Sequence, residues 1–156
     1  MQSTLQFMNM PTYLNDHLTD ETLGMELARR VGAEHKGTPL GTFLEMLSWE
    51  LEEDRETLAE LMRRLGVGRN LTAIRATIAE TLRNLRFRGS SPLSTLVALE
   101  SLDLRINEKL DMWNELRAGL GDRLDGIDFD EQVRRAELQA AVLVQRRLAV
   151  ASDALS

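Results

Sequence analysis

The sequence predicts an all-α protein in which four long helices of similar length lie side by side. Three observations predict this class. No alternation of Val, Ile, Thr or aromatic residues extends beyond a few positions, so strand signals are nearly missing. Leu, Ala, Glu, Arg and Met, which favour helices, dominate the chain. The helix-breaking residues fall in clusters, and these clusters divide the chain into five helical segments.

The first two segments are expected over residues 11–34 and 39–65. Gly37 follows the first segment and marks its end. Thr38 is a typical N-cap residue, and Pro39 follows it at the first helical position, where the missing N–H of proline costs nothing. The link between these segments is short, so an antiparallel helical hairpin is expected.

The remaining segments also begin at capping residues. Asn70 is a plausible cap for a shorter helix over 71–88. Ser91 repeats the cap-and-proline start, ahead of a helix that is expected to run to about residue 119. Asp128 can cap the last helix, expected over 129–154, and the acidic residues that follow it suit the positive end of the helix dipole.

The lengths and links predict an antiparallel four-helix bundle. The four long helices would each be roughly 35 to 42 Å long, so they can bury apolar stripes along their whole length in one core. The segment at 71–88 must then carry the chain from one hairpin to the other as a short crossover helix. We therefore expect one domain over residues 1–156, with an N-terminal extension at 1–10.

Composition excludes several classes of protein. The 156 residues contain no cysteine, so disulfides, thiolate zinc sites and cysteine nucleophiles are excluded. No apolar run approaches the roughly 18 to 20 residues that cross a membrane, and the first residues do not resemble a signal peptide. A cytoplasmic protein is expected. The formal charge of −6 argues against nucleic acid as the main partner.

The second long helix carries the cleanest apolar seam, and Asp54 interrupts it. Eight positions follow the 4-3-4-3 spacing of left-handed bundle packing, and all except Asp54 are leucine. Asp54 could lie where the bundle is locally open, could pair with an arginine, or could belong to an interior polar site. The seam positions are Leu40, Leu44, Leu47, Leu51, Asp54, Leu58, Leu61 and Leu65.

The first long helix has a similar interruption at Glu21. His17 lies four residues earlier on the same face, so it could contact Glu21. A buried carboxylate needs a cation, a donor or water, which His17 or an arginine of the third segment could supply. The expected apolar stripe of the helix that begins at residue 92 is Leu93, Leu96, Leu99, Leu102, Ile106, Leu110, Trp113, Leu116 and Leu120. That of the helix over 129–154 is Phe129, Val133, Ala136, Ala140, Val144, Leu148 and Ala151.

Two long hairpins, a connecting segment and carboxylates in mid-helix resemble the ferritin-like superfamily over about residues 11–154. The resemblance implies a di-iron centre built from glutamates and two Glu-x-x-His motifs. Neither motif is present, because the third residue after Glu50 is Glu53 and the third residue after Glu137 is Ala140. An all-carboxylate site for Fe or Mn is the alternative to a protein without cofactor. Its candidate ligands are Glu21, Glu50, Asp54, Glu100 and Glu137, with His17 as a further candidate.

Charge is segregated along the middle of the chain. Residues 45–60 contain seven acids and one arginine, whereas residues 63–88 contain seven arginines, no lysine and one acid. These arginines could pair with the acidic helix within the fold, pair across a dimer, or bind phosphate. A self-complementary surface of this kind favours a homodimer.

No catalytic signature is present. The chain has no phosphate-binding glycine loop and no Gly-x-Ser-x-Gly nucleophile motif. The sequence therefore favours a non-enzymatic helical bundle with a structural, stress-related or protein-interaction role. The alternative is a carboxylate-bound Mn or Fe protein with a degenerate di-metal site.

Overall fold

The computed structural model describes residues 9–86 and 91–156, which form five α-helices and no strand. The helices are α1 (Met10–Glu34), α2 (Pro39–Arg64), α3 (Leu71–Arg86), α4 (Pro92–Leu120) and α5 (Phe129–Ala154). The all-α class is therefore confirmed. Most of the expected extension at 1–10, and the end of the expected segment 71–88, lie outside the described residues.

The predicted caps are confirmed by hydrogen bonds to the first turns of the helices. The Gly41 N–H donates to Thr38 Oγ1 at 3.1 Å, and the Glu131 N–H donates to Asp128 Oδ1 at 3.0 Å. Ser91 and Asn70 accept in the same way from backbone N–H groups three residues later. Each bond satisfies one of the backbone donors that a helix leaves free at its start.

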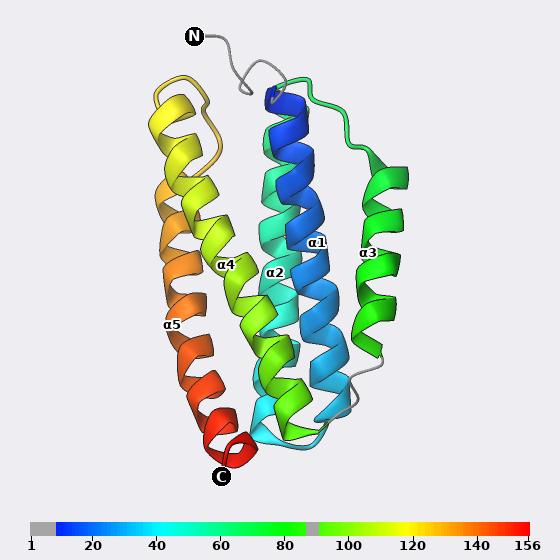
Figure 1. Ribbon diagram of the computed structural model, residues 1–156. Coiled ribbons are helices and arrows are strands. Elements are labelled where there is room, and N and C mark those ends of the chain that lie inside the picture. Colours follow the sequence, from blue (N-terminus) through cyan, green and yellow to red (C-terminus); the bar gives the residue numbers. More distant parts are fainter. Residues whose placement is uncertain (1–8, 87–90) are drawn as a thin grey trace, which may run out of the picture.

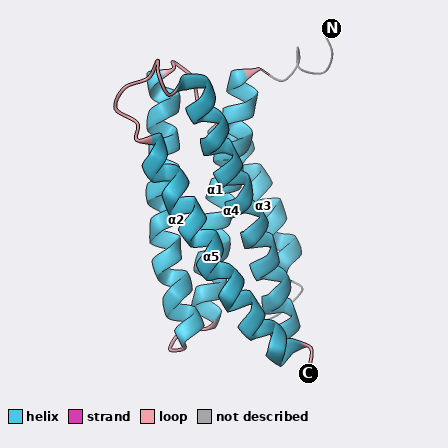
Figure 2. Cartoon of the chain, turned by 90° about the vertical axis from the view of Figure 1, so that its left-hand side faces the viewer, coloured by secondary structure: helices cyan, strands magenta, loops and turns pink. Residues whose placement is uncertain are grey.

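Figure 1 shows α1, α2, α4 and α5 side by side, with α3 on the outer side of α1. Contacts join α1 to α2, α4 to α5, α1 to α4 and α2 to α5. Each of these pairs is antiparallel, because α1 and α5 run in one direction and α2 and α4 in the other (Figures 1 and 2). The helix α3 packs mainly on α1 and carries the chain back along the length of the molecule, so that α2 and α4 run parallel.

The buried apolar residues form two clusters rather than the single core that was expected. The first cluster includes Leu18, Leu58 and Trp113, and the second includes Met25, Leu51 and Ile106. On each long helix, the residues of the two clusters are separated by a buried polar position. The seam of α2 is confirmed, since its six inner positions are all buried and its two end leucines are half-buried.

Three residues that were expected in the core are exposed instead. Leu148 of α5 is 64% exposed and Val144 is 40% exposed, whereas Leu143 is fully buried. A helix has 3.6 residues per turn, so a stripe that continues in steps of four beyond Ala140 rotates away from the core. For the same reason, steps of three rotate Leu93 of α4 outward, and it is 54% exposed.

None of the helices in the described ranges combines the length and the apolar character needed to cross a membrane.

Candidate functional site

A layer of buried polar side chains crosses the molecule at mid-height, and each of the four long helices contributes to it. Glu21 of α1, Asp54 of α2, Lys109 of α4 and Gln139 of α5 are each less than a tenth exposed. On every long helix, the layer residue lies between the positions of the two apolar clusters. We call these four residues the polar layer.

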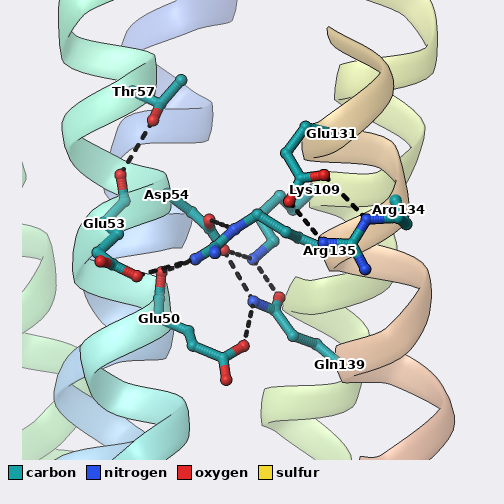
Figure 3. Close-up of polar contacts among 9 residues, drawn as sticks. All are labelled: Glu50, Glu53, Asp54, Thr57, Lys109, Glu131, Arg134, Arg135 and Gln139. Atoms are coloured by element: carbon teal, nitrogen blue, oxygen red, sulfur yellow. Dashed lines mark hydrogen bonds and ion pairs between the residues drawn. The ribbon is translucent and has the colours of Figure 1, made fainter. Parts of the chain in front are cut away.

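Asp54 is the centre of the hydrogen bonds in the polar layer (Figure 3). Its Oδ2 accepts from Lys109 Nζ at 2.6 Å and from Gln139 Nε2 at 2.9 Å. Its Oδ1 accepts from Arg135 Nε at 2.7 Å. Asp54 and Lys109 are nearly inaccessible, with side chains 2% and 3% exposed, whereas Arg135 is 22% exposed. Asp54 therefore forms an ion pair with an arginine and also belongs to an interior polar site, so two of the three alternatives given for it hold together.

Gln139 and Arg135 connect the polar layer to the surface of α2. The Gln139 amide oxygen accepts from Lys109 Nζ at 2.5 Å, and its Nε2 also donates to Glu50 Oε1 at 3.1 Å. Arg135 Nη2 donates to the Glu50 carbonyl oxygen at 3.1 Å and to Glu53 Oε1 at 3.2 Å. These bonds join α5 to α2 along a pair of helices that otherwise makes few contacts.

The environment keeps Asp54 ionised. Burial alone would raise the pKa of its carboxyl group, because an ionised group is less stable away from water. The neighbouring Lys109 charge, the hydrogen bonds from Lys109 and Gln139, and the Arg135 charge outweigh burial, so the pKa of Asp54 lies below its usual value. The buried cation of Lys109 is thus matched by a stable anion.

Glu21 is the one residue of the polar layer without a bonded partner. Neither carboxyl oxygen makes a hydrogen bond to any described residue, although the side chain is buried. Burial raises the pKa of Glu21 to about 8, an effect that the Lys109 charge reduces and the Asp54 charge reinforces. At neutral pH the group is therefore mostly protonated, and the charges of the polar layer are those of Asp54 and Lys109, with the Arg135 charge beside them.

The structure places the other metal-ligand candidates apart from one another. Glu50 is half-buried at the edge of the polar layer, but Glu100 and Glu137 are exposed on the outer faces of α4 and α5. The His17 ring packs edge-on against the Tyr13 ring, with centroids 4.6 Å apart. Burial lowers the pKa of His17, and nearby carboxylates only partly oppose this.

The residues of the polar layer do not fit an Fe or Mn centre. Within residues 9–86 and 91–156, no group of three or more His, Cys, Asp or Glu side chains is arranged to hold a metal ion. Both oxygens of Asp54 already accept hydrogen bonds from cations. A divalent cation beside Asp54 would be repelled by Lys109 and Arg135, because like charges at short range destabilise one another.

Lys109 was not among the residues predicted from the sequence, although the chain contains a signal for it. Leu102, Ile106, Lys109, Trp113 and Leu116 follow the alternating spacing of four and three that defines a bundle seam. Lys109 therefore interrupts the seam of α4 as Asp54 interrupts that of α2. The opposite charges at two mid-seam positions would have predicted the pair.

No family model matches this chain, and comparisons with curated proteins and with solved structures give no match. The function is therefore inferred from the residues of the chain itself.

Proposed function

We propose that the protein is a ferritin-like, antiparallel four-helix bundle with a short crossover helix, and that its role is structural, stress-related or protein-binding rather than enzymatic. The two antiparallel hairpins, α1 with α2 and α4 with α5, and the outer position of α3 support the bundle assignment. This connectivity, in which a crossover makes the second and third long helices parallel, is that of ferritin-like bundles.

The single observation that carries the proposal is the ion pair at the centre of the bundle. In a ferritin-like metal protein, inward-pointing carboxylates of four helices hold cations. Here the Lys109 ammonium group lies 2.6 Å from Asp54 Oδ2 and supplies the positive charge from the chain itself. A fully hydrogen-bonded buried pair sets the register of helices, because a slip by one residue would leave a charge unpaired.

We further propose that the protein is a cytoplasmic homodimer. The exposed side of α2 is acidic, and the exposed arginines of α3 can complement it across a two-fold axis. Arg75 and Arg83 are exposed and make no salt bridge with the described residues, which leaves them available for such a contact.

The alternative function, a carboxylate-bound Mn or Fe protein, has weaker support. Its best candidate ligand is Glu21, whose buried carboxyl oxygens have no partner among the described residues. Of the other candidate carboxylates, Asp54 is bonded to cations, Glu50 is half-buried and accepts a hydrogen bond from Gln139, and Glu100 and Glu137 are exposed.

Metal analysis of protein purified without chelator separates the two functions. The proposed function predicts far less than one Mn or Fe per chain, and an unfolding temperature that neither added metal changes. A matched sample of Glu21→Gln controls for metal held at the surface, because that variant keeps every exposed carboxylate. Stoichiometric metal in the wild type that is lost in Glu21→Gln would contradict the proposed function and establish the alternative.

A further inference from the structure

A groove of about 270 Å³ lies where α3 packs on α1 beside α2, away from the polar layer. Its floor is apolar and comes from α1 and α3, and its rim carries three arginines from α2, α3 and the connection between them. The floor is formed by Leu18, Ile74 and Ile78, and the rim arginines are Arg55, Arg69 and Arg75. We call this site the arginine groove.

Two of the three rim arginines have no acidic partner among the described residues. Glu56 is the only described acid that lines the groove, and it pairs with the third arginine, Arg55, at 3.3 Å. Neither Arg69 nor Arg75 forms a salt bridge with any described residue. By contrast, Arg63 and Arg64, which lie nearby at the end of α2, both pair with Glu60. The groove is thus a local excess of positive charge on a chain whose formal charge is −6.

The floor of the arginine groove is apolar. Leu18 and Ile74 are 3% and 5% exposed, and Ile78 is half-buried beside them. Small-molecule sites in proteins combine such an apolar lining with a few polar groups that fix the orientation of the ligand. Guanidinium groups suit oxyanions in particular, because their planar forks donate two parallel hydrogen bonds to a carboxylate or a phosphate.

We propose that the arginine groove binds a small amphiphilic oxyanion, that is, a carboxylate or a phosphate monoester attached to a short apolar group. The head group would lie between Arg69 and Arg75, and the apolar group would lie against Ile78, the most exposed residue of the floor. A groove of about 270 Å³ has room for a ligand of roughly ten non-hydrogen atoms, since a water molecule occupies about 30 Å³ of liquid. This inference concerns a different site from the polar layer and does not rest on the proposed function.

Nuclear magnetic resonance titration of the full chain tests this site. The probes are hexyl phosphate, hexanoate, inorganic phosphate and 1-hexanol, observed through the backbone amides of residues 69–78. We expect saturable shifts with hexyl phosphate or hexanoate at concentrations below about 10 mM, and at least about tenfold weaker binding of inorganic phosphate and of hexanol. Tighter binding of hexyl phosphate would identify a phosphate ester as the ligand class, and tighter binding of hexanoate a carboxylate.

Arg75→Gln and Arg83→Gln form a matched pair for the same titration. Both arginines are exposed on α3, but only Arg75 lines the groove. Arg75→Gln should weaken binding about tenfold, as expected for the loss of one charged hydrogen-bonding group, whereas Arg83→Gln should leave it within about twofold. Arg69→Gln, in the connection before α3, should repeat the effect of Arg75→Gln without altering that helix.

Three results would overturn the proposal. The first is the absence of saturable shifts with either amphiphile. The second is an equal loss of binding in Arg83→Gln, which would indicate that the whole basic surface of α3 attracts anions. The third is binding of inorganic phosphate as tight as that of hexyl phosphate, since the apolar floor would then contribute nothing.

Discussion

Asp54 and Lys109 are each other's main charged partner in the interior, so the effect of changing one depends on whether the other remains. Lys109 has only Asp54 and the neutral Gln139 as hydrogen-bond partners in the described chain. A buried ion pair contributes little net stability, because the cost of removing both ions from water offsets their attraction. Its disruption is costly, because one charge is left buried without its counter-ion.

We therefore expect Asp54→Leu to lower the free energy of unfolding by about 3 to 5 kcal/mol. Replacing both charges, in Asp54→Leu with Lys109→Met, should recover most of that loss, because no buried charge then lacks its partner. Urea unfolding of the two variants is the measurement. Asp130→Ala serves as a control, since its side chain is 85% exposed and its pair with Arg117 is worth less than about 1 kcal/mol. A double variant as unstable as Asp54→Leu would contradict the pairing.

Glu21 makes the stability of the fold depend on pH. Its pKa is about 8 in the folded state and near the ordinary value of 4.5 in the unfolded chain. The folded state therefore binds one more proton between these values, so the stabilisation is present at low pH and is lost as pH rises towards 8. His17 makes the stability of the fold rise with pH, but only below pH 6.5, because its pKa is lowered. The pKa of Asp54 is also lowered, so Asp54 changes the stability only in the acid range.

Between pH 6.5 and 8 we expect the wild type to lose up to roughly 2 kcal/mol of stability. The stability of Glu21→Gln should not change with pH over this range, because the amide does not titrate. Urea midpoints at several pH values test this. Glu26→Gln is the control, because Glu26 lies on the same helix but is one-third exposed. The stability of this variant should fall with pH as steeply as that of the wild type. A slope that persists in Glu21→Gln would show that another group binds the proton.

At the scale of the elements, the turn between α1 and α2 depends on Gly41. A Cβ atom at this position would lie 2.1 Å from the His35 carbonyl oxygen, which is part of the backbone and cannot move aside alone. The turn is tight because Thr38 bonds back to the same oxygen through both its N–H and its hydroxyl group. The close approach of the two helices therefore requires glycine.

Gly41→Ala should destabilise the protein by more than about 2 kcal/mol, because the turn has to open and the first contacts of the α1–α2 hairpin separate. Gly119→Ala is the matched control within α4. A Cβ atom at position 119 meets nothing within 4 Å, so the change should stabilise the helix by up to about 1 kcal/mol. Thermal unfolding of both variants tests the turn, and a neutral Gly41→Ala would show that the hairpin tolerates a wider opening.

At the scale of the whole molecule, the proposed dimer joins an acidic face to an arginine-rich one. Glu53 and Glu56 are exposed on α2, and Arg75 and Arg83 are exposed on α3. Charges exposed in this way attract one another more strongly at low salt, since dissolved ions screen them.

We expect a dimer at low salt that weakens as salt is added. The charge reversals Arg83→Glu and Arg86→Glu should shift the protein towards the monomer, and Arg123→Glu, in the loop between α4 and α5, should not. Sedimentation at low and high salt is the measurement. A species of 17.6 kDa at tens of micromolar and low salt would refute the dimer.

The sequence by itself determined the all-α class, the beginnings of four helices and the seam of α2. These features are local, because capping residues and the spacing of leucines act within a few residues of the same helix. The spacing also placed Asp54 and Glu21 on the apolar stripes of their helices, but it left open whether Asp54 was buried. The predictions of buried residues were wrong at Leu93, Val144 and Leu148. There the spacing departed from 3.6 residues per turn, so the predicted stripe turned away from the core.

Only the tertiary structure decided which side chains meet in the interior. Asp54 and Lys109 are 55 residues apart in the chain, and their contact depends on how far α4 is displaced along α2. That displacement is set by packing across four helices and is not encoded in any one of them. The arginine groove has the same origin, because its floor and rim belong to α1, α2, α3 and the connection before α3, which come together only when α3 packs on α1 beside α2.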